Sequence, residues 1–383
     1  MRSTRLISIG IMLCVISPSI ALAQFSSGST GADGPLNVTS NLTLDLPPTG
    51  IFNFTTITVA SGSTLRFNRN PLNTPVYLLA TGDVVIIGTI DVSGKVSTFG
   101  KGGEGGPGGF DGGSPANGQE TSPGDGLGPG GGKGSVNNPG GGAYSSINCP
   151  SGGSGQAYGN TLIVPLIGGS GGGGTTRSDG LGGGGGGGGA ILIASNTRIS
   201  IGSSGKISSF GGDGIGSVGS GGAVRLVANQ IDGSGQVVAM AGSCTAGFGR
   251  VRVDATNRFA LFLNYGVSSI GGTPHTIGQF MHVFPTNTSR LDIIEAAGTA
   301  ISEGTPIPVP VQLPVGSPTN QVVKIQARDF TGIVPITVAV TPDAGPSTRY
   351  DTQIDMAGGN VASTDVTVNI PVGTTSRIYA WTR

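Results

Sequence analysis

Short alternations of apolar and polar residues recur along the first two thirds of the chain and predict β-strands separated by Gly, Ser and Asn corners. One strand pattern appears four times, at 75–81, 189–195, 222–229 and 249–256. The Ala residues that close the copies are 114, 34 and 27 residues apart: Ala80, Ala194, Ala228 and Ala255. A period near 30 residues with repeated corners is typical of a stacked parallel β-solenoid. An ordinary β-sandwich is the alternative, but it does not require the same corner residues in the same order.

The faces of these strands follow from the period of two along a strand. Residues two and four positions before each closing Ala are apolar and are predicted to face the core: Val76, Leu78, Ala190, Leu192, Val224, Leu226, Val251 and Val253. The intervening residues, among them Ile191, Ile193, Arg225, Arg252 and Asp254, are then predicted to face outward. Two further strand families complete each turn. We place them at 57–59, 85–87 and 199–201, and at 64–67, 89–92, 206–208 and 237–239.

A glycine-rich insertion at 95–189 interrupts the repeat and holds 39 of the 74 glycines of the chain. Its composition is that of a flexible or polyproline-like excursion. Smaller glycine-rich stretches at 211–222 and 242–249 follow the same corner in later turns. The one strongly apolar run in the insertion, 161–167, is expected to cover Ile191 and Ile193 on the outer wall.

The two ends of the chain differ from the repeat. Residues 1–23 combine a basic start, a short apolar run and a small-x-small site, which is typical of a secretory signal peptide. A Ser/Gly linker at 24–35 precedes the solenoid at 36–256, and a connector at 257–301 follows it. Residues 302–383 are predicted to form a small all-β sandwich of the immunoglobulin or fibronectin III type, with strands at 309–315, 321–329, 334–341, 350–356, 365–372 and 377–381.

These features predict an exported protein that is periplasmic, at the cell surface or extracellular, with no transmembrane segment after cleavage. Charged residues make up 10% of the chain and the formal net charge is zero, so no basic surface for nucleic acid is expected. His275 and His282 are too few for a metal site, and no cofactor is expected. Arg225, Arg252 and Asp254 fall on adjacent turns and are expected to form an ion-paired, solvated wall that serves as a contact surface. A catalytic wall is the alternative, and no catalytic residue is assigned.

Two cysteines remain after removal of the signal peptide, Cys149 and Cys244. Both lie in glycine-rich stretches at the same corner, two turns apart, in a chain addressed to an oxidising compartment. An intramolecular disulfide between them is therefore predicted. Free thiols, or pairing of Cys149 between molecules, are the alternatives.

The turns at 82–94 (GDVVIIGTIDVSG) and 196–212 (NTRISIGSSGKISSFGG) resemble those of glycine-rich β-helical exported bacterial proteins, of the type found in filamentous-haemagglutinin-like adhesin passengers. The resemblance implies a cell-surface or extracellular role in contact or adhesion. We expect a non-enzymatic structural or adhesion-type protein. Surface glycans or other cell-surface components are then the expected partners. The alternative is a carbohydrate-binding or degraded polysaccharide-lyase-like β-helix protein.

Overall fold

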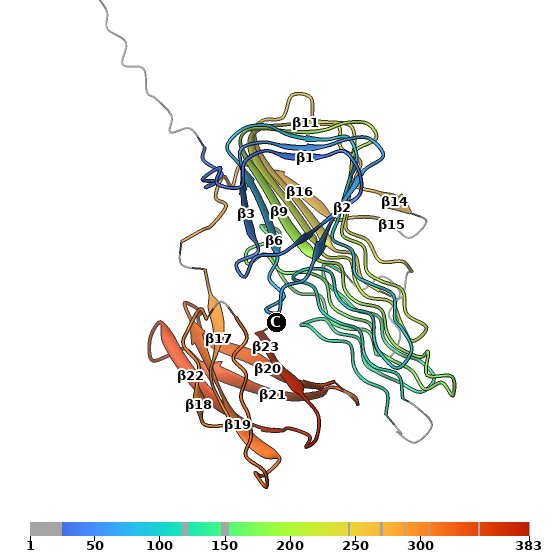
Figure 1. The fold of residues 1–383 in the computed structure, drawn as a ribbon, viewed down its shortest axis with the longest axis vertical. Helices are drawn as coiled ribbons and strands as arrows, with labels where there is room; N and C mark the ends of the chain where they lie inside the picture. Colours follow the sequence, from blue (N-terminus) through green and yellow to red (C-terminus); the bar gives the residue numbers. More distant parts are fainter. Residues whose placement is uncertain are drawn as a thin grey trace, which may run out of the picture.

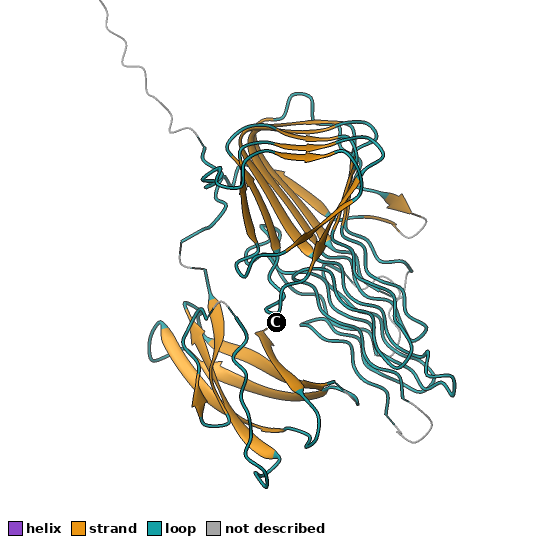
Figure 2. Ribbon diagram, in the orientation of Figure 1, coloured by secondary structure: helices purple, strands orange, loops and turns teal. Residues whose placement is uncertain are grey.

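The computed structural model describes a chain built of strands and long extended segments. It covers residues 25–116, 122–146, 153–243, 246–268, 271–286, 288–305, 307–343 and 345–382. Within these ranges all regular elements are β-strands, and there is no helix, as Figure 2 shows. The predicted signal peptide, 1–23, lies outside the described residues.

Two parallel sheets form the first part of the molecule. In the larger one the strands run in the order β1-β4-β7-β9-β11-β13-β16, with β3 and β6 pairing beside β9. Its strands are β1 (Leu36–Val38), β3 (Ile51–Phe54), β4 (Ile57–Val59), β6 (Val76–Ala80), β7 (Val84–Ile86), β9 (Ala190–Ile201), β11 (Ala223–Gly233), β13 (Arg250–Asn257) and β16 (His275–Gly278). The smaller sheet has the order β12-β10-β8-β5-β2. Its strands are β2 (Leu42–Asp45), β5 (Thr64–Asn68), β8 (Thr89–Asp91), β10 (Lys206–Ser208) and β12 (Gln236–Val238).

The long gap in the repeat is an insertion between two strands that are direct neighbours. β6 pairs in parallel with β9, so that Val76 lies beside Ile191 although the whole glycine-rich region separates them in sequence. Seen along the stack in Figure 1, the strands surround a closed apolar interior on three sides. This interior is filled by one row of side chains from each strand, such as Leu65, Ile90, Ile207 and Val237 from the smaller sheet.

The predicted facing of two strands is wrong by one residue. Leu78 pairs with Ile193 and Ala80 with Ser195, so Ile191 and Ile193 enter the core while Leu192 and Ala194 face outward. A slip of one residue exchanges the two faces of a strand. Likewise Ile57 pairs with Val84, which places the strand at 84–86 instead of 85–87. The pairing predicted among 64–67, 89–92 and 206–208 is confirmed. The fourth strand of this family runs from 236 to 238 instead of 237 to 239, so Ile207 pairs with Val237.

The glycine-rich insertion is ordered where it is described. Segment 184–189 lies among three neighbouring segments. Its successive N–H groups donate to these three segments in rotation, so every third residue donates to the same neighbour. This is the period of polyproline II, which makes no internal hydrogen bonds and turns its backbone groups outward. The bonds run from Gly184 and Gly187 to Gly113 and Phe110, from Gly185 and Gly188 to Ser217 and Ser220, and from Gly186 and Gly189 to Lys95 and Val92, all at 2.7–3.1 Å.

We call this assembly the glycine lattice; it comprises the described parts of 92–189 with 209–222 and 239–249. In Figure 1 its segments run side by side away from the parallel sheets. Glycine is required because neighbouring backbones touch: a Cβ on Gly187 would overlap the carbonyl of Gly169, and one on Gly184 would overlap the carbonyl of Gly172. Of the two alternatives that the composition left open, the polyproline-like one is therefore found.

The apolar run 161–167 lies against the outer face of the larger parallel sheet, as predicted, but over different residues. Ile163, Leu166 and Ile167 pack with Ala190 and Ala223, together with the two buried rings Tyr144 and Tyr158. Leu166 also joins the outward cluster around Leu192. The register slip explains the change of partner, because Ile191 and Ile193 are on the inner face.

The C-terminal part consists of two antiparallel sheets, with the orders β18-β17-β19-β22 and β21-β20-β23. Their strands are β17 (Arg290–Ala296), β18 (Thr299–Ala300), β19 (Asn320–Arg328), β20 (Ile333–Pro342), β21 (Thr348–Asp355), β22 (Val361–Asn369) and β23 (Ser376–Thr382). Five of the six predicted strands are present. The sixth, 309–315, is not a strand, and β17 from the predicted connector pairs with β19 in its place. The connector also holds β16 and the hairpin of β14 (Val267–Ser268) and β15 (Gly271–Gly272).

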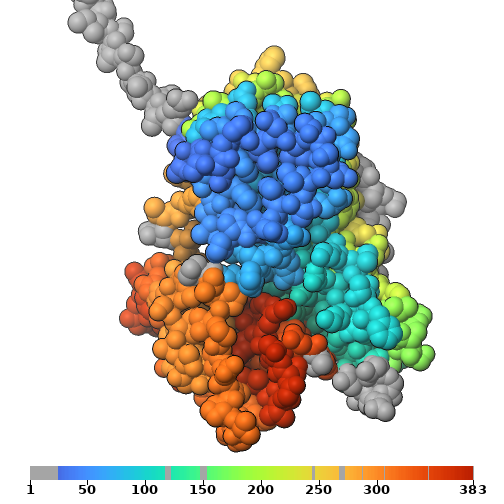
Figure 3. Space-filling view, in the orientation of Figure 1, coloured from blue at the N-terminus to red at the C-terminus, as the bar shows by residue number. Residues whose placement is uncertain are grey.

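The antiparallel sheets rest against the glycine lattice, and the two bodies lie next to each other in Figure 3. Trp381 of β23 packs edge-on to Phe110 of the lattice with ring centroids 5.8 Å apart, and Leu127 joins this contact. Beside it Arg349 of β21 lies over the Trp381 ring and 3.7 Å from the carboxylate of Asp125. The lattice thus supports the C-terminal sheets through an apolar cluster around Trp381 and an ion pair between Arg349 and Asp125.

The close backbone contacts in the lattice predict that adding a single methyl group to one of its inner glycines destabilises the protein. In Gly187→Ala the new Cβ must displace the backbone of segment 168–174, and overpacking of this kind costs about 1–3 kcal/mol or more. The midpoint of urea unfolding should fall accordingly. Gly358→Ala is the matched control, since a Cβ there meets nothing within 4 Å. Equal midpoints for the two variants would contradict an ordered lattice.

Candidate functional site

The predicted contact wall of Arg225, Arg252 and Asp254 is a buried ionic cluster. Arg225 lies on β11, the other two lie on β13, and all three point outward from the core as predicted. However, Arg225 and Asp254 are only 1% and 0% exposed. The expectation of a solvated surface is therefore wrong, and the cause is a later part of the chain that covers this face.

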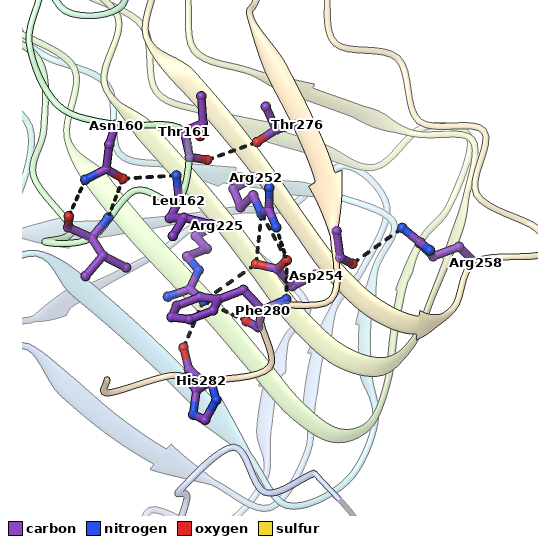
Figure 4. Close-up of polar contacts among 12 residues, drawn as sticks. Asn160, Thr161, Leu162, Arg225, Arg252, Asp254, Arg258, Thr276, Phe280 and His282 are labelled. Atoms are coloured by element: carbon purple, nitrogen blue, oxygen red, sulfur yellow. Dashed lines mark hydrogen bonds and ion pairs between the residues drawn. The ribbon is translucent and has the colours of Figure 1, made fainter. Parts of the chain in front are cut away.

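The covering segment is 279–284, which we call the strap. It leaves β16 at the end of the larger parallel sheet and crosses the outer face of that sheet, as Figure 4 shows for Phe280 and His282. Met281 and Val283 pack on the outward apolar residues Leu79, Leu192, Ala194 and Val227. The ring of Phe284 lies 5.2 Å from that of Tyr77. The strap therefore closes the outer face from the last strand back toward the first ones.

The buried cluster binds the backbone of the strap. Arg225 Nη2 donates to the carbonyl oxygens of Phe280 and His282 at 3.0 and 2.8 Å. The N–H of Phe280 donates to Asp254 Oδ1 at 2.8 Å. Asp254 also accepts from Arg252 at 2.6 Å and lies 3.6 Å from Arg225 Nη2. Each charged group thus has a partner of opposite sign or a strap carbonyl, as buried charges require.

Burial lowers the pKa of Arg225 from its usual value, and the neighbouring carboxylate of Asp254 opposes that change. Burial also raises the pKa of Tyr77, which lies under the same strap. Arginine stays protonated even so, and it has no acceptor function. The cluster is therefore a fixed set of donors and acceptors that holds the strap, and it offers no accessible group to a ligand.

Exposed apolar side chains gather instead at the outer ends of the glycine lattice. They lie in the turns 96–101, 134–139, 175–181 and 213–218, which we call the distal turns. Five of their side chains are exposed: Val96, Phe99, Val136, Leu181 and Ile215, with Phe99 75% exposed. These residues were not predicted from the sequence. The available signal was isolated large apolar residues between glycine runs.

The distal turns adjoin one another through hydrogen bonds. Gly100 N donates to Gly180 O at 2.9 Å and Ser97 N to Asp213 O at 3.0 Å. Thr175 Oγ1 donates to Val136 O at 2.7 Å. The Phe99 ring lies directly against Gly180, where no side chain separates the two turns. The exposed apolar residues therefore share one end of a hydrogen-bonded assembly.

The remaining candidate chemistry does not assemble into a metal site in the part of the chain that the structure describes. No group of three or more His, Cys, Asp or Glu side chains is placed to hold a metal ion there. The ring of His275 stacks on Tyr265 with centroids 3.8 Å apart, and His282 belongs to the strap. Both histidines thus have packing roles.

No family model, curated protein or solved structure matches this chain. Among the described segments none forms a helix of the length and hydrophobicity that crossing a membrane requires.

Removing one charge from the buried cluster is predicted to lower the free energy of unfolding strongly. Asp254→Asn leaves Arg225 and Arg252 buried without a counter-charge, and breaking a buried pair in this way costs about 3–5 kcal/mol. The Arg66–Asp91 pair is the matched control, because Arg66 is half exposed and its N–O distance is 3.2 Å. Asp91→Asn should change the free energy of unfolding by less than about 1 kcal/mol. Urea unfolding of both variants distinguishes them, and similar losses would show that the cluster is solvated.

Cys149 and Cys244 both lie outside the described residues, so their disulfide stays a prediction. The described residues next to them are close: Ser145 N donates to Phe248 O at 2.9 Å, and Phe248 N donates to Ser146 Oγ at 3.2 Å. Peptide mapping under non-reducing conditions should recover one linked peptide containing both cysteines. Two free thiols, or a dimer that reduction dissolves, would contradict it.

Proposed function

We propose that this chain is an exported, non-enzymatic structural or adhesion-type surface protein, in which a β-solenoid carries a rigid glycine lattice whose distal turns make the contact. The two parallel sheets and their enclosed core support the solenoid part of this proposal. The two packed antiparallel sheets support an immunoglobulin- or fibronectin III-like sandwich at the C-terminus. The observation that carries the functional part is the set of exposed apolar side chains on the distal turns.

A contact role follows from where these side chains lie. The lattice is rich in glycine, and charged residues near its outer end form ion pairs, as Arg177 does with Asp179 and Lys95 with Glu104. Exposed apolar residues that occur together mark interaction surfaces, whereas single ones need no explanation. The turns are also held by hydrogen bonds, so little conformational entropy is lost when a partner binds.

The lyase-like alternative receives less support. It needs charged residues on the outer wall that a polysaccharide chain can reach, and the sequence offered Arg225, Arg252 and Asp254 for this role. Because the strap covers them, a substrate cannot touch the carboxylate of Asp254 without displacing the strap.

The test displays the protein on a bacterial host that lacks it and counts cells that attach to neighbouring cells and to solid surfaces under flow. The double variant Phe99→Ser, Ile215→Ser should lower attachment at least about tenfold, since fully burying each such side chain contributes about 1.5–3 kcal/mol. Phe259→Ser is the matched control, because this ring is 95% exposed but lies outside the lattice. Attachment that is unchanged in the double variant would refute the proposed contact surface.

A further inference from the structure

A hollow of about 370 Å³ lies where the glycine lattice meets the C-terminal sheets. One side is formed by the lattice, with 122–125 and Lys133. The other side is formed by the start of β21 and the residues before it, 346–349, with Asp351. Its size falls within the range of small-molecule sites, about 300–1,000 Å³, and junctions between packed bodies are a common place for such sites.

The charges that line the hollow balance one another. Asp125 accepts from Lys133 Nζ at 2.9 Å and lies 3.7 Å from Arg349 Nη1. Asp351 is the second carboxylate, so the lining has two acidic and two basic side chains. An anionic ligand would meet both carboxylates, and a cationic ligand would meet Lys133 and Arg349. The lining therefore favours a neutral ligand that hydrogen bonds.

The two carboxylates are held in place by the protein and keep lone pairs for further hydrogen bonds. Asp125 Oδ1 accepts from Gly134 N at 2.8 Å, and Asp351 Oδ1 accepts from Thr337 Oγ1 at 2.6 Å. A carboxylate has about four lone-pair sites, so each can accept further bonds from hydroxyl groups. The ring of Trp381 lies under Arg349 and fixes its guanidinium. Hydroxyl groups on adjacent carbons both donate and accept, which suits carboxylates beside cationic donors.

We infer that the hollow binds a neutral, hydroxyl-rich glycan, and that this ligand contacts the lattice and the C-terminal sheets at once. This site is separate from the distal-turn side chains that carry the proposed contact role. A ligand that touches both bodies stabilises their packing, because it binds the docked arrangement and not the separated one.

The full mature chain is first applied to an array of neutral, acidic and amino-sugar glycans, and hits are titrated by calorimetry. We expect a neutral oligosaccharide to bind and to raise the thermal midpoint of unfolding. Lys133→Ala with Asp351→Asn should weaken binding at least tenfold, while Lys324→Ala, which removes a partly exposed lysine paired with Asp365 on the C-terminal sheets, should not. Circular dichroism and the thermal midpoint without ligand show that each variant is folded.

Three outcomes would overturn the inference: no neutral glycan binds, only charged glycans bind, or the Lys133 and Asp351 variant binds as tightly as the parent. The Phe99 and Ile215 variant should bind the same oligosaccharide with unchanged affinity. The two sets of variants therefore test the glycan site in the hollow and the contact role of the distal turns independently.

Discussion

The close approach of backbones in the glycine lattice is the constraint on which the rest of the structure depends. A buried extended segment must find a partner for every N–H and C=O, and without a sheet it does so by bonding to several neighbours in turn. In segment 184–189 this succeeds because three other segments lie within hydrogen-bond distance. Any Cβ on the inner residues would separate them, as the overlap at Gly187 with the Gly169 carbonyl shows. The glycines thus replace side-chain packing by a network of backbone bonds.

Two other parts of the fold are arranged around this network. The lattice continues directly from the strands, since Gly189 precedes β9 and bonds to Val92 after β8 at 2.7 Å, so the stacking of the parallel sheets sets the stacking of the lattice. The C-terminal sheets then rest on its side through Trp381 and Arg349. The strap brings the chain back across the larger sheet to reach that position, and Arg225 and Asp254 hold its backbone. This return path of the chain explains why charged residues are buried on the outer face of the larger sheet.

Sequence reasoning located the strands well and their faces less well. The strands at 64–67, 89–92 and 206–208 of the smaller sheet were correctly registered because Leu65, Ile90 and Ile207 alternate with polar residues. The stretch Ala190–Ala194 is apolar on both faces, so alternation could not identify the inner one, and alignment on Ala194 chose wrongly; Ser195 takes the place of the closing Ala. The strap has no hydrophobic periodicity, so no local sequence pattern indicated that Arg225 would be buried. β17 was missed where a register shift between Ile293 and Glu295 interrupts its alternation.

The way the distal turns are held bears on the proposed contact role. An ordinary exposed loop must be ordered when it binds, and fixing one backbone residue costs about 1–2 kcal/mol. Here each turn closes two runs whose backbone groups are already bonded to neighbours, so that cost is met during folding. Phe99 gains a further constraint because its ring rests on Gly180, which has no side chain to move. An apolar group fixed in this way can keep most of the free energy that its burial against a partner provides.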